Sequence, residues 1–192
     1  SGSNHAYCSY QNSYYAFSNK RIVLYSPDDN KAHFISNTKL IMSTVIFPEI
    51  PIIGCYNNDL YYLSDPCTVT CISESKISKP FAYTTNRITV LATSETFHVL
   101  IIGTQDGFIH IYKEPQGELI KTISLRNELK NDDYEIKRIL ITPTWGLILV
   151  QTEGILTVFD INGTFVHSIK FTEPILNWYG FTDFHLFDYV VF

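Results

Sequence analysis

Short apolar runs separated by Gly, Asn or Asp recur along the chain, most clearly after residue 87. The runs there cover 88–94, 99–103, 108–113 and 119–124, and the triplets Gln105-Asp106-Gly107 and Pro115-Gln116-Gly117 separate them. Runs of this length between turn residues predict β-strands rather than helices. The pattern therefore predicts a four-stranded meander over 88–124.

The same plan repeats over 137–171. Its apolar runs cover 139–142, 147–152, 155–160 and 165–171, with Glu153-Gly154 and Asn162-Gly163 between strands. Asp-Gly and Asn-Gly pairs tolerate the positive φ angles that tight hairpins require. Two such signals at corresponding places indicate a structural repeat.

Weaker copies of the repeat precede and follow these two. One covers 6–36 with runs at 14–18, 21–26 and 32–36, a second covers 42–73 with runs at 42–47, 52–56, 59–64 and 68–73, and an incomplete copy covers 175–192. The second strand of each copy begins roughly 38 to 49 residues after the second strand of the copy before it, close to the span of a propeller blade. We predict an all-β, WD-repeat-like β-propeller of about four to five four-stranded blades.

No Pro/Gly/Ser-rich boundary divides the chain, so we predict a single domain over 1–192, with Ser1–Ser3 as a cloning remnant. The linker 126–137, which carries Asp132 and Asp133, is predicted to be a solvated loop, with a short helical turn as the alternative. About four and a half blades do not close a ring that protects its edge strands, which favours part of a larger ring.

Composition narrows the function classes. Fourteen basic and 19 acidic residues give a net charge of −5, so no general attraction to nucleic acid or anionic lipid is expected. No apolar run approaches the roughly 20 residues of a membrane-spanning helix. The four cysteines match neither a paired zinc motif nor a compact disulfide scaffold, which favours reduced thiols.

The stretch 103–112 resembles a WD repeat, whose turn Asp and third-strand aromatic correspond to Asp106 and Tyr112. The pair Phe159-Asp160 is similar to a relaxed Trp-Asp dipeptide. The Gly-His dipeptide that opens such repeats is absent, so the resemblance does not extend to the complete hydrogen-bonded tetrad of a WD blade.

From residue 88 onward the succession of motifs resembles the carboxy-terminal WD-repeat region of BEACH-family (Beige and Chediak-Higashi) proteins, of divergent protozoan type. The motifs that carry this resemblance are 139–148, 156–163, 174–178 and 187–190. The resemblance implies a cytoplasmic scaffold in vesicle or lysosome trafficking that recruits other proteins. It also implies that any association with vesicle or endolysosomal membranes is peripheral or indirect.

The candidate residues divide into turn residues and interaction anchors. Asp106 and Asp160 could be paired acids of a hydrolase, but local turn chemistry favours a structural role. Trp145 and Trp178 are candidate anchors for a protein partner, with packing between blades as the alternative. The predicted structural turn residues are Asp106, Gly107, Asp160, Asn162 and Gly163.

No metal or cofactor is expected, because the six histidines are scattered and no phosphate loop, nucleophile elbow or His-Glu-x-x-His motif occurs. We therefore predict a non-enzymatic protein-interaction scaffold. The alternative is a propeller hydrolase or lyase with its site at the central channel. Convergent carboxylates or histidines would favour that enzyme, whereas exposed aromatics on one face would favour the scaffold.

Overall fold

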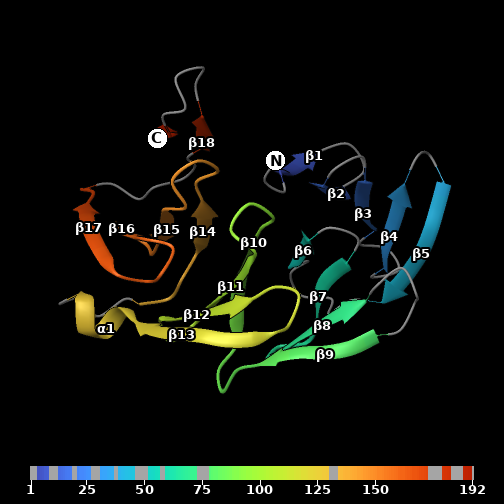
Figure 1. Ribbon diagram of the computed structural model, residues 1–192, viewed down its shortest axis with the longest axis horizontal. Helices are drawn as coiled ribbons and strands as arrows, with labels where there is room; N and C mark the ends of the chain where they lie inside the picture. The colour runs from blue at the N-terminus through green and yellow to red at the C-terminus, as the bar shows by residue number, and fades with distance from the viewer. Residues whose placement is uncertain are drawn as a thin grey trace. The chain divides into compact units, whose positions relative to one another are not determined.

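The described part of the chain is built almost entirely from antiparallel strands (Figure 1). The computed structural model describes residues 4–8, 13–18, 21–26, 31–36, 39–45, 52–56, 59–72, 78–129, 134–172, 179–182 and 188–191. The chain divides into two compact units, Ser1–Thr85 and Asn86–Phe192. The single domain over 1–192 stays a prediction.

The first unit contains two sheets whose strands follow one another in chain order. One has five strands: β1 (Asn4–Cys8), β2 (Ser13–Ser18), β3 (Arg21–Ser26), β4 (Lys31–Ser36) and β5 (Lys39–Val45). The other has four: β6 (Ile53–Tyr56), β7 (Asp59–Asp65), β8 (Thr68–Ile72) and β9 (Ser78–Tyr83). Each is a meander, the arrangement of a propeller blade.

The strand grouping in this unit differs from the sequence prediction. The run from Met42, expected to open a blade over 42–73, lies in β5, which pairs with β4 and belongs to the first sheet. Only two residues separate β4 from β5, and so short a connection favours pairing of neighbouring strands. The second sheet is completed by β9, which the pattern analysis missed because Pro80 interrupts it.

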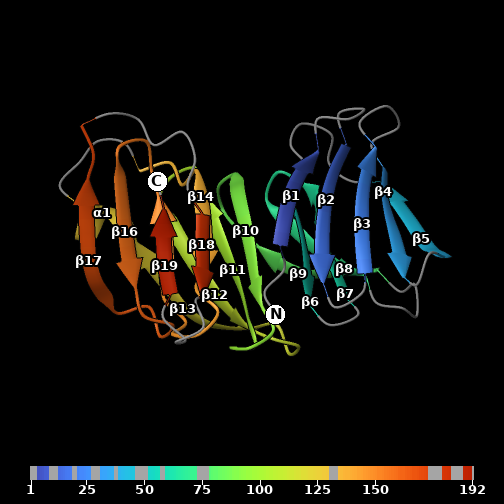
Figure 2. The ribbon, with the colours of Figure 1, turned by 90° about the horizontal axis from the view of Figure 1, so that it is seen from above.

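The second unit follows the predicted repeat within one or two residues. Its first sheet contains β10 (Ile88–Ser94), β11 (Val99–Thr104), β12 (Phe108–Lys113) and β13 (Glu118–Ser124). Its second contains β14 (Arg138–Ile141), β15 (Ile148–Gln151), β16 (Ile155–Phe159) and β17 (Phe165–Lys170). A two-stranded pair follows, β18 (Tyr179–Thr182) with β19 (Asp188–Val191) (Figure 2).

A β-bulge recurs at the last strand pair of all four larger sheets. The register shifts in β5, β9, β13 and β17 leave one apolar residue of each strand without a partner across the ladder: Ile41, Phe81, Ile120 and Val166 respectively. The shared bulge marks these as equivalent last strands. By this criterion β2–β5 form the four-strand unit of the first sheet, and β1 is an additional strand.

The core of the second unit fills the space between its two larger sheets. Ile101, Ile109 and Ile111 from one sheet pack with Ile148 and Phe159 from the other, and all five are fully buried. Aliphatic side chains project toward the neighbouring sheet at every second residue, which is the period of a strand. Their burial stabilises the pair by roughly 1.5–3 kcal/mol for each large side chain.

The linker expected to be a solvated loop is exposed or partly exposed at most of its described residues but is fixed at two apolar positions. It begins as the short helix α1 (Leu125–Glu128), as the alternative proposed, and Leu125, Leu129 and Ile136 are buried. Asp132 and Asp133 lie outside the described residues. The loop prediction weighed the charges and overlooked these apolar positions.

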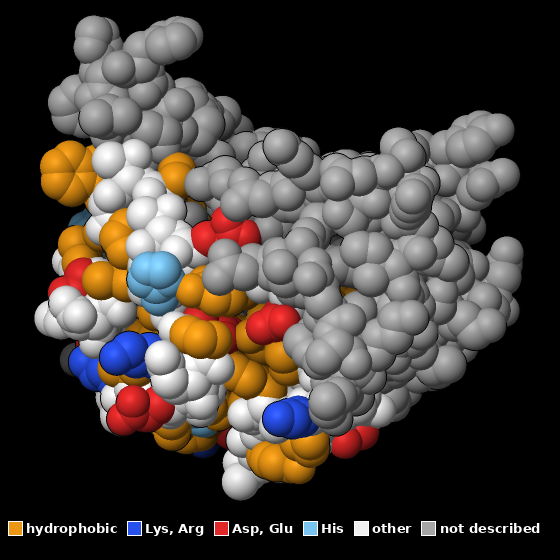
Figure 3. Space-filling view, turned by 45° about the vertical axis from the view of Figure 1, so that its right-hand side comes forward, with side chains coloured by type: hydrophobic (Ala, Val, Ile, Leu, Met, Phe, Trp, Pro, Cys, Tyr) orange, Lys and Arg blue, Asp and Glu red, His pale blue; other side chains and the backbone are white. Residues whose placement is uncertain are grey.

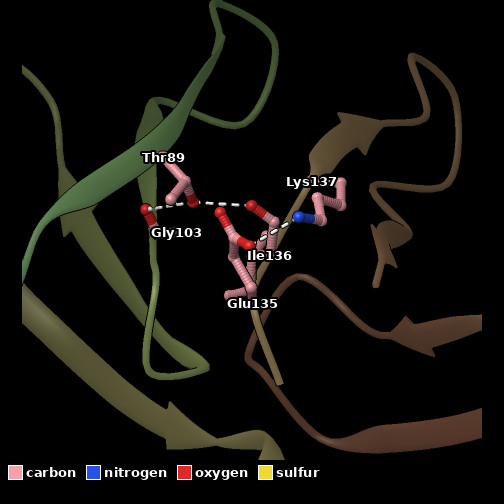
Figure 4. A network of polar contacts seen from close by, with 5 residues as sticks. All are labelled: Thr89, Gly103, Glu135, Ile136 and Lys137. Atoms are coloured by element: carbon pink, nitrogen blue, oxygen red, sulfur yellow. Dashed lines mark hydrogen bonds and ion pairs between the residues drawn. The ribbon is translucent and has the colours of Figure 1, made fainter. Parts of the chain in front are cut away.

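A threonine hydroxyl fixes the end of this linker to the preceding sheet (Figure 4). Thr89 Oγ1 lies 2.6 Å from the carbonyl oxygen of Ile136 and 3.3 Å from that of Gly103. Glu135 and Lys137 beside it form a partly exposed ion pair, which contributes little to stability. The hydroxyl therefore connects β10 with the segment that leads into β14.

Candidate functional site

Four turns lie at one end of the two larger sheets of the second unit: 95–98 and 114–117 of the first sheet, and 142–147 and 160–164 of the second. In the first sheet the register pairs Ser94 with Val99, Val99 with Lys113, and Lys113 with Glu118, so its two turns share an end. The second sheet has the same arrangement. We call this end the Trp145 end, and the opposite one, with turns 105–107 and 152–154, the Asp106 end.

The turns of the Trp145 end contact one another within and between the sheets. The Glu114 N–H donates to the His98 carbonyl oxygen at 2.8 Å, which joins the two turns of the first sheet. The Phe97 ring lies against Gly146, so close that a Cβ atom there would be 2.8 Å from Cζ. Lys121 Nζ donates to the Gly163 carbonyl oxygen at 2.9 Å. The first two contacts join three of the turns, and Lys121 of β13 bonds to the fourth.

Trp145 is held at this end by a turn with a fixed conformation. The Thr142 N–H donates to the Leu147 carbonyl oxygen, the Leu147 N–H donates to Thr142 Oγ1, and the Gly146 N–H donates to the Thr142 carbonyl oxygen. Gly146 has a φ of 66°, which glycine adopts without strain. Although the turn is closed in this way, the Trp145 side chain is 61% exposed.

Further large apolar side chains are exposed near these turns. Leu119 and Ile120 follow the turn 114–117, and Phe165 and Val166 follow the turn 160–164. Ile120 and Val166 are the bulged residues, and each is about half exposed. Figure 3 shows one side of the molecule, on which hydrophobic side chains lie between polar and charged ones.

The sequence analysis proposed Trp145 as an anchor, which stays a prediction, and did not name these four residues. They occupy strands with ordinary β patterns, so residue type alone does not separate them from core positions. Their place directly after the third turn of each repeat was the available signal. Trp178, the other predicted anchor, lies outside the described residues.

Both ends carry charges of both signs. Within the four turns of the Trp145 end the ionisable acids are Glu95, Glu114 and Asp160, and the same turns contain no Lys or Arg. Glu114 is buried, Lys113 and Glu118 flank one turn, and Lys121 Nζ contacts the Gly163 carbonyl oxygen of another. The described segments at the Asp106 end carry both signs, from Arg87, Asp106, Arg126, Glu128, Glu135, Lys137 and Glu153.

Asp106 lies at the centre of a hydrogen-bonded turn. Its carboxylate accepts from Thr104 Oγ1 at 2.7 Å and from Asn86 Nδ2 at 2.6 Å. Thr104 Oγ1 also accepts from the Phe108 N–H at 3.0 Å. Gly107 has a φ of 84° and is buried. Asn86 thus donates to the turn aspartate although the chain lacks the Gly-His dipeptide, and the sequence analysis did not single it out.

A second hydrogen-bonded turn lies at the Trp145 end and contains Asp160, Asn162 and Gly163. Asp160 Oδ1 accepts from the Thr164 N–H at 2.7 Å, and the Asp160 carbonyl oxygen accepts from the Gly163 N–H at 2.9 Å. Asn162 is exposed within the turn. The two aspartates therefore lie at opposite ends of neighbouring sheets, and each closes its own turn by hydrogen bonds. Their assignment as structural turn residues stays a prediction.

His110 is the titratable group of the second unit with a clear perturbation at near-neutral pH. Burial lowers its pKa from 6.5, and the Asp106 carboxylate partly opposes this effect. Its Nδ1 lies 3.0 Å from Thr122 Oγ1, and its ring is stacked with that of Phe108. Thr122 is exposed, and the Asp106 carboxylate is bonded to Thr104 and Asn86.

Neither a cluster of metal ligands nor a membrane-spanning helix occurs among the described residues. No group of three or more His, Cys, Asp or Glu side chains could hold a metal ion there. No helix in that part of the chain is long and apolar enough to cross a membrane. Cys67 and Cys71 are not joined in a disulfide and are partly buried. The expected absence of cofactor and metal stays a prediction.

The sequence matches no protein-family model and no curated protein. Solved structures resemble the chain in fold. The WD40 β-propeller domain of Doa1 has a TM-score of 0.65 at 16% identity, over 82% of this chain and 53% of that one. Hsv2 of Kluyvelomyces marxianus has a TM-score of 0.61 at 15% identity, over 77% of this chain and 48% of that one. The computationally designed Ika8 protein has a TM-score of 0.64 at 13% identity, over 83% and 49%.

The chain thus spans about half the length of these structures. At such low identity the likeness concerns the fold, and it confirms the prediction of an all-β propeller. The assignment to the BEACH family receives no such support. The fold is that of WD-repeat-like β-propeller blades.

Proposed function

We propose that this chain is a non-enzymatic protein-interaction scaffold that binds a partner at the Trp145 end of its second unit. One observation carries the proposal. Of the six exposed large hydrophobic side chains described in this unit, five lie near the four turns of that end, and Ile169 lies toward the other. Exposed apolar side chains gathered in one region of a folded domain are typical of interaction sites.

The position of the acids supports a scaffold rather than a propeller hydrolase or lyase. Paired acids in hydrolysis must converge on one bond, at separations of roughly 5–9.5 Å in glycosidases. Asp106 and Asp160 belong to turns at opposite ends of two sheets; the Asp160 carboxylate bonds within its turn, and that of Asp106 bonds to Thr104 and Asn86. Nor do the described residues include a cluster of metal ligands.

The finer assignment is to the WD-repeat region of a BEACH-family protein in vesicle or lysosome trafficking. Its support is the succession of motifs after residue 88, together with a propeller fold of the WD40 type. In that role the protein would be cytoplasmic, and other proteins would hold it at vesicle or endolysosomal membranes. The net charge of −5 agrees with indirect rather than direct membrane contact.

Affinity capture tests the scaffold role. The full chain is immobilised and exposed to extract from its source cells, and the retained protein is then purified and titrated against the chain. We expect direct, saturable binding with a Kd tighter than about 10 μM, the range of specific transient interfaces. Failure to find any protein that binds directly would contradict the scaffold role.

The family assignment has a separate test in the coding sequence that precedes these residues. A BEACH module encoded there would support it. An unrelated catalytic module would overturn the assignment and would favour the enzyme alternative.

A further inference from the structure

We propose that Asn162 is a modification site, at which the side-chain amide converts to a carboxylate, and that the folded turn 160–164 controls the rate of this reaction. The inference goes beyond the proposed scaffold function and does not depend on it. Three observations carry it: Asn162 is exposed, Gly163 follows it, and hydrogen bonds around this pair hold the turn closed.

The reaction is the one open to an asparagine that precedes a glycine. The Gly163 backbone nitrogen attacks Cγ of Asn162, so a nitrogen–carbon bond forms and the bond from Cγ to Nδ2 breaks. Nδ2 takes up the proton of the backbone amide and leaves as ammonia, and a five-membered succinimide ring remains. Water then opens the ring at either carbonyl group, which gives aspartate or isoaspartate. Water is the only co-reactant.

The local sequence makes Asn162 the most reactive asparagine of the unfolded chain. It is the only asparagine in the sequence that a glycine follows. Glycine has no Cβ atom to obstruct the approach of its nitrogen to the neighbouring side chain. In the folded chain Asn162 is exposed, so water reaches the side-chain amide. Exposure of the amide is therefore not what limits the reaction in the fold.

The turn restrains the attacking nitrogen instead. The Gly163 N–H donates to the Asp160 carbonyl oxygen at 2.9 Å, and the amide must leave this acceptor before it can give up its proton. The Thr164 N–H donates to Asp160 Oδ1 at 2.7 Å, and the Asp160 N–H donates to the Thr164 carbonyl oxygen at 2.9 Å. Amides bonded in this way become available only when the segment opens locally. The reaction rate should therefore follow the opening of this turn.

The neighbouring sheet adds a second restraint. Lys121 Nζ, from β13, donates to the Gly163 carbonyl oxygen at 2.9 Å. Gly163 is buried, and a Cβ atom there would lie 2.7 Å from Ile123 Cδ1 and 3.2 Å from Ile111 Cδ1. Gly163 cannot move away from Asp160 without disturbing these contacts. The packing of β13 against the turn therefore also controls the reaction at Asn162.

Conversion changes the turn permanently. A carboxylate replaces a neutral amide two residues from Asp160, and isoaspartate adds a carbon atom to the backbone. The Gly163 N–H then no longer meets its acceptor in the same geometry. The strand that follows the turn, β17, has no buried residue, so its pairing with β16 depends strongly on the turn. The modified residue thus records that the turn has opened.

The full chain is incubated in mildly alkaline buffer, where hydroxide removes amide protons, and in the same buffer with urea. Mass spectrometry of the intact chain and of its proteolytic peptides follows the mass gain of amide conversion and locates it. Asn162→Gln is the control for the assignment, because the larger ring that glutamine must close forms far more slowly.

We expect conversion in urea to occur at Asn162 before any other asparagine, and to be at least about tenfold slower at this residue in the folded chain. Asn162→Gln should lose the fast conversion. Equal rates at Asn162 with and without urea, or faster conversion of another asparagine in urea, would overturn the inference.

Matched variants test the two restraints. Lys121→Met is compared with Lys170→Met, an exposed lysine of β17, and Asp160→Ala with Glu153→Ala at the Asp106 end. Without urea, Lys121→Met and Asp160→Ala should each accelerate conversion by about two- to tenfold, because each removes a hydrogen bond that holds the turn. The two controls should change the rate by less than about twofold.

In urea all four variants should react at the rate of the unchanged chain, since the turn is absent there. Urea unfolding shows which variants remain folded, and if Asp160→Ala does not fold, the comparison of Lys121→Met with Lys170→Met decides. Equal rates for these two lysine variants would show that β13 does not control the turn, and the inference would then be wrong.

Discussion

Gly163 shows how one residue sets both the conformation of a turn and the packing of two sheets. Its φ is 75°, and a Cβ atom there would lie 2.7 Å from Ile123 Cδ1 of the neighbouring sheet. We expect Gly163→Ala to reduce the free energy of unfolding by about 1–3 kcal/mol, from the strained φ and the displaced isoleucine. Urea unfolding measures the change.

Gly154→Ala is the matched control, because the nearest atom to its added Cβ is 3.9 Å away and its φ is not in the positive range. Its effect should stay within about 1 kcal/mol. Equal losses for both variants would show that Gly163 is not required by its conformation or its contacts.

Thr104 connects the Asp106 turn to β12 through its hydroxyl. Thr104→Val removes the hydrogen bonds to Asp106 Oδ1 and from the Phe108 N–H, and we expect a loss of about 1–3 kcal/mol. Thr152 occupies the corresponding place in the next sheet and is equally buried, but its hydroxyl lies 3.5 Å from its acceptor. Thermal unfolding should therefore show a smaller loss of stability for Thr152→Val than for Thr104→Val.

His110 should make stability depend on pH. Because burial lowers its pKa in the folded chain from 6.5, the unfolded chain binds the proton first as the pH falls. The free energy of unfolding should therefore decrease below about pH 6.5 and lose this component in His110→Gln. Urea unfolding of both proteins at about pH 7.5 and pH 5.5 measures the difference. An equal pH dependence would mean that His110 does not couple to folding.

At the scale of elements, the sequence predicted strands best where turn chemistry was explicit. Gln105-Asp106-Gly107 and Asn162-Gly163 fixed the hairpins of the second unit, so β10–β17 lie within one or two residues of their predicted ranges. In the first unit no such signal separates β5 from the following sheet, and Pro80 concealed β9. Asn86 was missed because its partnership with Asp106 joins residues 20 positions apart.

The link between β10 and the segment before β14 can be tested at Thr89. Its hydroxyl bonds to the carbonyl oxygen of Ile136, a fully buried residue. Thr89→Val should cost about 1–3 kcal/mol of unfolding free energy, because a buried acceptor loses its donor. Thr96→Val changes an exposed turn residue and should cost less than about 0.5 kcal/mol. Similar costs would mean that this hydrogen bond does not hold the linker.

At the scale of the whole molecule, the spacing of the repeats was sufficient to predict a propeller. The interaction surface was not predictable in the same way. Whether Ile120 is exposed and Ile111 buried depends on a bulge and on the position of the next sheet. Both residues belong to similar apolar runs, and local sequence does not contain that information.

The same architecture predicts a gradient of local stability across each sheet. All six residues of β11 and all four of β15 are buried, whereas β17 has no buried residue. A last strand also directs half of its backbone groups away from its neighbour. Amide hydrogen exchange should show protection near the global unfolding free energy in β11 and β15 and far less in β13 and β17. Protection in β17 as strong as in β15 would require a further strand on that edge, which the bulge at Val166 disfavours.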